Sequence, residues 1–221
     1  MLNLDASWNI RNYQFCGENG LLLYFAGASL AKQNTHVTQC FHFLSKNVPD
    51  WVTDLVPSFD SLLVVFDTAY ADHYAALQLL CRTQQQGSVE TTKREYQVAV
   101  KYSLAPDYDL TELAKSLNVL PQRIVELHCA QPLRVYAIGF APGFAYLGEL
   151  PDNLQVSRRP SPRTHVPAGA VAIADSYSAV YPAVSPGGWN LLGQVADLAE
   201  FQQLKLQVGD SVQFYPDSIE S

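Results

Sequence analysis

Residues 135–193 constrain the fold of this chain most strongly, because prolines and glycines are concentrated there. Eight of the thirteen prolines lie between Pro132 and Pro186, and seven of the twelve glycines lie between Gly139 and Gly193. Proline restricts φ, whereas glycine adopts positive φ readily. The same stretch is rich in aromatic residues and arginines. Rigid loops carrying such side chains are suited to binding a ligand, and the alternative is an all-β domain with many tight turns.

The composition is that of a globular protein. Of the 221 residues, 48% are apolar and 16% are charged, and the formal net charge is −7. This acidic balance disfavours nucleic acid or an anionic membrane as a general partner. No basic segment followed by an apolar one opens the chain, so no signal peptide is predicted. The four cysteines are widely spaced with no C-x-x-C pair, which predicts reduced thiols and a cytoplasmic location.

The first half of the chain alternates strand and helix patterns. Apolar runs and alternation predict strands at 21–26, 51–56, 62–67 and 96–102, and helical spacing predicts helices at 35–46 and 70–86. The order strand–helix–strand–strand–helix–strand is typical of a ferredoxin-like domain. We therefore expect an α+β protein with a ferredoxin-like α/β domain at 1–95 and a second domain at 96–221, although the strand at 96–102 fits either domain.

Residues 109–128 predict two short helices, the second of which begins at Pro121. Such a pair resembles a DNA-binding helix-turn-helix. Only Gln122 and Arg123 would be available to read bases, and the surrounding charge is acidic, so we reject that interpretation.

Short apolar strands alternate with turns from Pro132 onward. They are predicted at 134–140, 170–174, 178–182 and 211–215. This spacing is typical of a β-barrel or a β-sandwich. The segment LQVGDSVQFY at 206–215 predicts two strands joined by a turn.

Three segments of this half resemble the signature segments of one known family. They are GFAPGFAYLG (139–148), PRTHVPAG (162–169) and YPAVSPGGWNLLG (181–193). The family includes the B subunit of the bacterial ATP-dependent 5-oxoprolinase, subunit 1 of allophanate hydrolase and the sporulation-kinase inhibitor KipI. The resemblance extends over nearly the whole chain.

This resemblance implies a ferredoxin-like N-terminal domain followed by a C-terminal cyclophilin-like β-barrel. It also implies a hydrolase subunit that is active in a hetero-oligomer with a homologous C subunit plus a separate A subunit. The assembly would open 5-oxoproline to glutamate with ATP and Mg²⁺, at a site shared between the chains. Two other interpretations stay open: subunit 1 of an allophanate hydrolase of the urea amidolyase type, and a KipI-like inhibitor whose partner is a sensor histidine kinase.

The chain departs from the family pattern at three positions. Asp175 and Ala179 stand where relatives have glycine, and His165 stands where they have arginine. Because glycine allows backbone conformations that other residues avoid, the loss of two glycines restricts the backbone of the loop at 175–180.

Opening a lactam with ATP requires positive charge near phosphoryl oxygens, donors for an oxyanion and a group that moves protons. We expect Arg163 to supply charge, because Pro162 restrains its backbone, with Arg158 and Arg159 as further cations. His128 ends a predicted helix and is the candidate proton carrier. The alternatives are surface ion pairs for the arginines and a buried structural role for His128.

Contacts to substrate or nucleotide are expected from the loops of the signature segments. Paired glycines allow close backbone approach and can cradle an anion, whereas the alternative is tight turns with aromatic rings filling the barrel. The candidate binding residues are Phe140, Pro142, Gly143, Phe144, Tyr146, Arg159, Thr164, Ser185, Gly187, Gly188 and Trp189. No metal site is predicted, because the chain has neither an H-x-x-x-H nor an H-E-x-x-H pair, and it has no P-loop motif.

Overall fold

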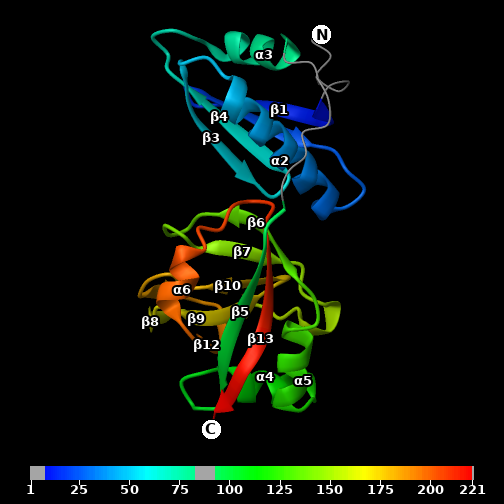
Figure 1. The fold of residues 1–221 in the computed structure, drawn as a ribbon, viewed down its shortest axis with the longest axis vertical. Helices are drawn as coiled ribbons and strands as arrows, with labels where there is room; N and C mark the ends of the chain where they lie inside the picture. Colours follow the sequence, from blue (N-terminus) through cyan, green and yellow to red (C-terminus); the bar gives the residue numbers. More distant parts are fainter. Residues whose placement is uncertain (1–7, 83–92, 221) are drawn as a thin grey trace. The chain divides into compact units, whose positions relative to one another are not determined.

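The computed structural model describes residues 8–82 and 93–220. The chain divides into two compact units, Met1–Thr92 and Lys93–Ser221 (Figure 1). The division falls just before the predicted boundary at 95, and it assigns the strand predicted at 96–102 to the second unit.

The first unit contains an antiparallel sheet covered by helices. Its strands follow the order β1-β2-β4-β3. The elements described in this unit are β1 (Ile10–Cys16), β2 (Gly20–Phe25), α2 (Leu30–Asn47), β3 (Val52–Ser58), β4 (Ser61–Phe66) and α3 (His73–Arg82). Alternate apolar residues of β2 and β4 pack against both helices, which is the arrangement that period-two side chains produce on a half-buried sheet.

The ferredoxin-like order predicted from the sequence differs from the structure in one strand. The position beside β2 is taken by β1, which precedes the predicted elements. The pattern of β1 escaped prediction because Ile10 is its one buried residue and the others are exposed or half-buried. The helix predicted at 35–46 begins earlier, at Leu30, where the Ser29 hydroxyl accepts a hydrogen bond from the Lys32 amide (3.2 Å).

The second unit is a closed β-barrel. Its strands pair in the order β6-β13-β5-β12-β9-β10-β7, and β7 pairs back to β6. These strands are β5 (Glu95–Ser103), β6 (Leu133–Ile138), β7 (Ala145–Gly148), β9 (Ala170–Ala174), β10 (Tyr177–Val180), β12 (Asn190–Val195) and β13 (Ser211–Glu220). A separate two-stranded sheet joins β8 (Arg163–Val166) to β11 (Ser185–Gly187). Closure pairs every barrel strand on both sides, so the barrel has no free edge.

Three α-helices accompany the barrel. They are α4 (Leu110–Leu117), α5 (Pro121–His128) and α6 (Leu198–Gln203), with a 3₁₀ turn at Asp152–Leu154. Helices α4 and α5 lie together at one end of the barrel (Figure 1), and their apolar residues belong to the barrel core. The helix pair that resembled a DNA-binding motif is therefore core packing. Within residues 8–82 and 93–220, every helix is too short or too polar to cross a bilayer.

One predicted strand does not form. Residues 206–208 are irregular, and only the second half of the segment 206–215 becomes a strand, β13. The Asp210 carboxylate accepts a hydrogen bond from the Gln207 amide (2.8 Å) and pairs with Arg94 (2.7 Å). This local bond replaces a sheet hydrogen bond, as short polar side chains often do.

Candidate functional site

A pocket of about 320 Å³ opens on the surface of the barrel unit. The lining comes from four loops and strand ends that are far apart in the sequence. The lining residues are Phe140, Phe144, Tyr146, Arg158, Arg159, Pro162, Tyr181, Pro186, Gly187, Gly188 and Trp189. Seven of these were predicted as binding residues from the sequence, so the signature segments converge on one cavity. Its volume lies near the lower end of the usual range for small-molecule sites, roughly 300–1,000 Å³.

The pocket walls are aromatic rings in edge-to-face contact. Phe144 lies at the centre, with ring-centroid distances of 5.1 Å to Tyr146, 5.3 Å to Tyr181 and 5.6 Å to Trp189. Such T-shaped pairs hold one another in place. The walls therefore form a rigid apolar surface suited to a small ring or hydrocarbon group.

Close packing shapes the glycine-rich side of the pocket. A Cβ on Gly187 would lie 2.8 Å from Tyr181 Cζ and still closer to its hydroxyl, so any larger residue there would force Tyr181 to move. A Cβ on Gly188 would meet its nearest neighbour, Pro162, at an ordinary 3.7 Å. Of the two paired glycines, Gly187 is therefore the one whose position leaves no room for a side chain unless Tyr181 moves.

Phe140 stands at the edge of this pocket in an unusual conformation. Its φ is 73°, in the left-handed region, and its ring is 64% exposed. Bulky residues are uncommon in this region because it costs them free energy. The exposed ring lies 5.3 Å from that of Phe144, at the rim of the pocket.

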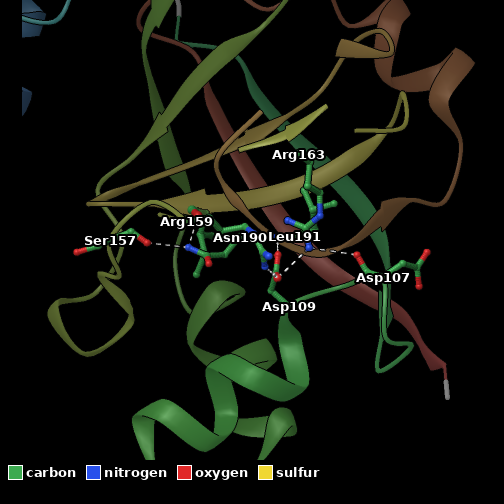
Figure 2. A network of polar contacts seen from close by, with 8 residues as sticks. Asp107, Asp109, Ser157, Arg159, Arg163, Asn190 and Leu191 are labelled. Carbon is green, nitrogen blue, oxygen red and sulfur yellow. Dashed lines mark hydrogen bonds and ion pairs between the residues drawn. The ribbon is translucent and has the colours of Figure 1, made fainter. Parts of the chain in front are cut away.

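A buried carboxylate organises the arginines next to the pocket (Figure 2). Asp109, just before α4, is 3% exposed and pairs with both Arg159 and Arg163, the latter at 2.8 Å. Its second oxygen accepts a hydrogen bond from the Leu191 amide (2.6 Å), and its own amide donates to the Leu191 carbonyl (2.7 Å). The network thereby joins α4 to β12 and fixes two guanidinium groups.

The loop that carries Arg159 is also held directly against the barrel. The Arg159 amide donates to the Gly188 carbonyl (2.8 Å), and the Asn190 side-chain amide donates to the Ser157 carbonyl (2.9 Å) and the Ile173 carbonyl (3.3 Å). These bonds on both sides of Arg158 set the path of the loop past the pocket.

The arginine network carries more positive charge than its acid neutralises. Two guanidinium groups share one carboxylate, which leaves a net charge of +1. In addition, Arg159 Nε and Arg163 Nη1 are buried without a hydrogen-bond partner among the described residues. Buried donors without partners are rare in proteins and call for an explanation. An anion beside the network would balance this charge.

The predicted roles of the arginines change in the structure. Arg163 was the first choice for a catalytic cation, but it lies on β8, bonds to Asp109 and to the Asp107 carbonyl (3.3 Å), and does not line the pocket. Arg158 ranked lower and does line it. Its Nε lies 3.4 Å from the Asp175 carboxylate, and both side chains are more than half exposed, at 62% and 56%.

His128 is not at the pocket, contrary to our prediction of a catalytic role. It is 1% exposed in the barrel core and stacks on Phe214 (4.7 Å). Its Nδ1 contacts the Tyr102 hydroxyl (2.7 Å) and its Nε2 contacts the Ser178 hydroxyl (2.8 Å). Burial lowers the pKa of His128 to about 3. A neutral, enclosed imidazole cannot reach a substrate, so the structural alternative applies.

The directions of these bonds assign the tautomer of His128. Because a backbone carbonyl can only accept, the Ser178 hydroxyl donates to the Ala172 carbonyl (3.2 Å). The Ser178 oxygen therefore accepts from His128 Nε2–H, and Nδ1 accepts from the Tyr102 hydroxyl. The Tyr102 oxygen in turn accepts from the Cys129 thiol (3.2 Å). The chain of bonds is complete and leaves no group for a ligand.

Four other predicted residues lie outside the pocket lining. Pro142 and Gly143 line a different depression, of about 410 Å³, together with residues of α6. Thr164 is exposed on β8, and Ser185 pairs with Val166 in the small sheet. Among the described residues, no group of three or more histidine, cysteine or acidic side chains could hold a metal ion.

Two departures from the family pattern have different consequences. Asp175 adopts φ 52°, a conformation that glycine favours and that aspartate tolerates. Ala179 lies in β10 with its side chain fully buried among the residues behind the pocket, and it needs no unusual φ. The loop therefore has a left-handed residue at 175 and carries a carboxylate there.

Sequence reasoning missed Asp109. Its position in DLTE, just before an apolar helix pattern, matches that of a helix N-cap, which would explain an aspartate without further function. The structure shows no capping hydrogen bond from this side chain. An aspartate in a capping position that makes no capping hydrogen bond indicates another role. The missing bond is evident only in the structure, where Arg159 and Arg163 pair with Asp109.

Comparisons with known proteins agree with the sequence resemblance. Residues 11–205 match the family model described as carboxyltransferase domain, subdomain C and D. Two of the relatives named as the B subunit of 5-oxoprolinase match about three quarters of this chain. The one from Haemophilus influenzae is 38% identical over 163 residues, which are 72% of this chain and 76% of that protein. The one from Escherichia coli O157:H7 is 34% identical over 170 residues, which are 75% and 78%.

Solved structures share the fold. The crystal structure of TTHA0988 superimposes with a TM-score of 0.78 and 32% identity, covering 90% of this chain and 40% of that one. This chain therefore spans about two fifths of that structure. The Kluyveromyces lactis urea amidolyase has a TM-score of 0.71 at 14% identity over 93% of this chain and 15% of that one, which indicates a common fold alone. The chain belongs to the family of carboxyltransferase domains, subdomains C and D.

Proposed function

We propose that this chain is the B subunit of an ATP-dependent 5-oxoprolinase and that its barrel pocket holds 5-oxoproline while the ring is opened to glutamate. Relatives named as 5-oxoprolinase B subunits motivate the activity. The observation that carries the proposal is the pocket, in which aromatic walls meet arginines and no carboxylate is among the lining residues.

The chemistry of the substrate fits these surroundings. 5-Oxoproline has a five-membered ring with apolar methylene groups, a lactam carbonyl and one carboxylate. The rings of Phe144, Tyr146 and Trp189 offer an apolar surface for the methylene groups, and Arg158 and Arg159 offer donors to the charged end. In this proposal the chain binds and orients the lactam, and the aromatic walls exclude water from it.

ATP would enter the reaction through the assembled enzyme. Bound with Mg²⁺, it would supply the phosphoryl group that activates the lactam oxygen. The sequence has no P-loop, and the described residues contain no acidic cluster suited to Mg²⁺. We therefore infer that the nucleotide binds at the partner A and C subunits or at a site shared with them. A cyclophilin-like classification of the barrel and a cytoplasmic location stay predictions.

Reconstitution tests the proposal. This chain is co-purified with its candidate A and C subunits, after which ATP hydrolysis is measured with 5-oxoproline and, in parallel, with allophanate. We expect ATP hydrolysis that depends on 5-oxoproline. An assembled complex that is inactive with 5-oxoproline contradicts the proposal, and activity with allophanate instead would assign the chain to the urea amidolyase branch. Binding of the chain to a sensor histidine kinase at micromolar concentration would favour the KipI-like alternative.

A further inference from the structure

The cations of the pocket differ in their availability to a ligand. The Arg159 guanidinium is bound to the almost completely buried Asp109, and the Arg159 side chain is 31% exposed. Arg163 shares the same carboxylate and does not line the cavity. A ligand that used either group as its main partner would have to compete with a buried ion pair, which is strongly coupled to the fold.

Arg158 is held much less firmly. It lines the pocket, and its Nε lies 3.4 Å from the Asp175 carboxylate in an ion pair. Both partners are mostly exposed, and exposed pairs of this kind contribute little. Its donors can therefore turn toward a ligand carboxylate at small cost.

Asp175 is held near Arg158 by its backbone. The Asp175 amide donates to the Val156 carbonyl (2.6 Å), two residues before Arg158, in an isolated β-bridge. Its φ of 52° is the left-handed conformation, which aspartate and asparagine both tolerate. The carboxylate is thus carried by a fixed backbone, and asparagine can replace it without new strain.

The charge balance limits the class of ligand. The Asp109 network has a net charge of +1, and the Arg158–Asp175 pair is neutral. A ligand with one negative charge therefore neutralises the site, whereas a nucleoside triphosphate carries several more. The apolar walls beside these cations suit a ring with methylene groups better than a planar polar acid such as allophanate.

We propose that Arg158 is the carboxylate anchor of this pocket and that Asp175 is a competing carboxylate that occupies Arg158 until a cyclic monocarboxylate displaces it. The inference rests on the proposed function, because it takes 5-oxoproline as the ligand. Asp175 then weakens binding of every anion at this site, and it leaves binding of uncharged analogues unchanged.

The test compares a charged and an uncharged ligand on matched variants of the full chain. Titration calorimetry measures the affinity for 5-oxoproline and for its carboxamide, which keeps the ring and lacks the charge. We expect Asp175→Asn to tighten 5-oxoproline binding about two- to fivefold, the range that loss of an exposed competing ion pair allows. We expect Arg158→Gln to weaken it at least about tenfold, as for loss of a charge-assisted bond. Neither change should alter carboxamide affinity.

Two controls distinguish a direct contact between Arg158 and the ligand from a general effect of protein charge on affinity. Glu126→Gln makes the same charge change as Asp175→Asn in an exposed pair on α5 outside the pocket lining, and it should leave both affinities unchanged. In the variant Arg158→Gln/Asp175→Asn, the gain from Asp175→Asn should disappear. An equal gain for the carboxamide, a gain that survives in the double variant, or no monocarboxylate binding in any variant overturns the proposal.

Kinetics of the assembled complex distinguish failure of this inference from failure of the proposed function. We expect Asp175→Asn to lower KM for 5-oxoproline and to leave kcat unchanged. A complex that turns over 5-oxoproline with no KM change in Arg158→Gln overturns the anchor while the function stands. A pocket that binds cyclopentanecarboxylate with the expected variant effects, in a complex inactive with 5-oxoproline, overturns the function while the anchor stands.

Discussion

The barrel unit contains two polar networks that differ in how completely they are satisfied. Around His128, every polar side-chain group has a hydrogen-bond partner. The bonds run from the Cys129 thiol through Tyr102 and His128 to Ser178 and a backbone carbonyl. Around Asp109, two guanidinium groups share one carboxylate, and two buried N–H groups have no partner among the described residues. The first network is enclosed in the core, and the second lies beside the pocket.

This difference shows where ligand chemistry can occur. A closed network has no unmet donor or acceptor, so it contributes to the fold and leaves nothing for a substrate. An unbalanced network is stabilised when a ligand supplies the missing charge. Residue type alone suggested the opposite for His128, because histidine is the usual proton carrier near neutral pH. The following experiments test the contrast between the two networks.

The largest effect is expected from Asp109→Ala. Removal of this carboxylate leaves two arginines without their anion and the Leu191 amide without its acceptor. We expect a loss of about 3–5 kcal/mol in the free energy of unfolding, as for other broken buried ion pairs. Urea denaturation measures it. Asp109→Asn, which keeps an acceptor for Leu191, should lose less, and equal losses in both variants would show that charge is unimportant here.

Acid should destabilise the protein through His128. Burial lowers its pKa to about 3, below the value near 6.5 expected in the unfolded chain. The unfolded state therefore binds more protons, so this contribution to stability is complete above about pH 6.5 and is lost as pH falls, by up to about 1.4 kcal/mol per pH unit. Urea denaturation between pH 7 and pH 4.5 should show a shallower slope for His128→Gln.

His165 provides the control for this acid effect. It is exposed on β8, so His165→Gln should keep the slope of the wild-type protein. If the free energy of unfolding of the wild-type protein did not depend on pH in this range, His128 would not be the buried, neutral imidazole described above.

Gly187→Ala tests the packing of the pocket. The new methyl group would overlap the Tyr181 side chain, and overpacking of this kind costs about 1–3 kcal/mol. Thermal denaturation and 5-oxoproline titration should both show a loss. Gly188→Ala adds the same methyl group with ordinary contacts and should keep both properties, so equal effects at the two positions would contradict the assigned geometry.

The smallest effect is expected from Arg163→Gln. Arg159 still pairs with Asp109 in this variant, so the expected loss is about 1–2 kcal/mol, near that of one hydrogen bond to a charged group. Because Arg163 does not line the pocket, ligand affinity should change less than in Arg158→Gln. A larger affinity loss in Arg163→Gln would restore the role first predicted for it.

Several elements of the fold were predictable because their local patterns are strong. The strand predicted at 170–174 is β9, and Pro121 opens α5 as expected. Strand β1 was missed because almost none of its side chains is buried, so it has no apolar alternation. The predicted strand at 206–208 was wrong because the Asp210 side chain takes the backbone donor that a strand would use.

The amino-acid sequence by itself determined the family, the barrel segments and the aromatic and glycine residues of the pocket, because these are encoded in continuous motifs with restricted backbones. The tertiary structure alone decided which charged groups are available. Asp109 pairs with Arg159 and Arg163, about fifty residues further along the chain. Asp175 pairs with Arg158 beside the β-bridge that joins Val156 to Asp175. Charge availability depends on partners and burial, which are set by contacts between distant segments and leave no local pattern in the sequence.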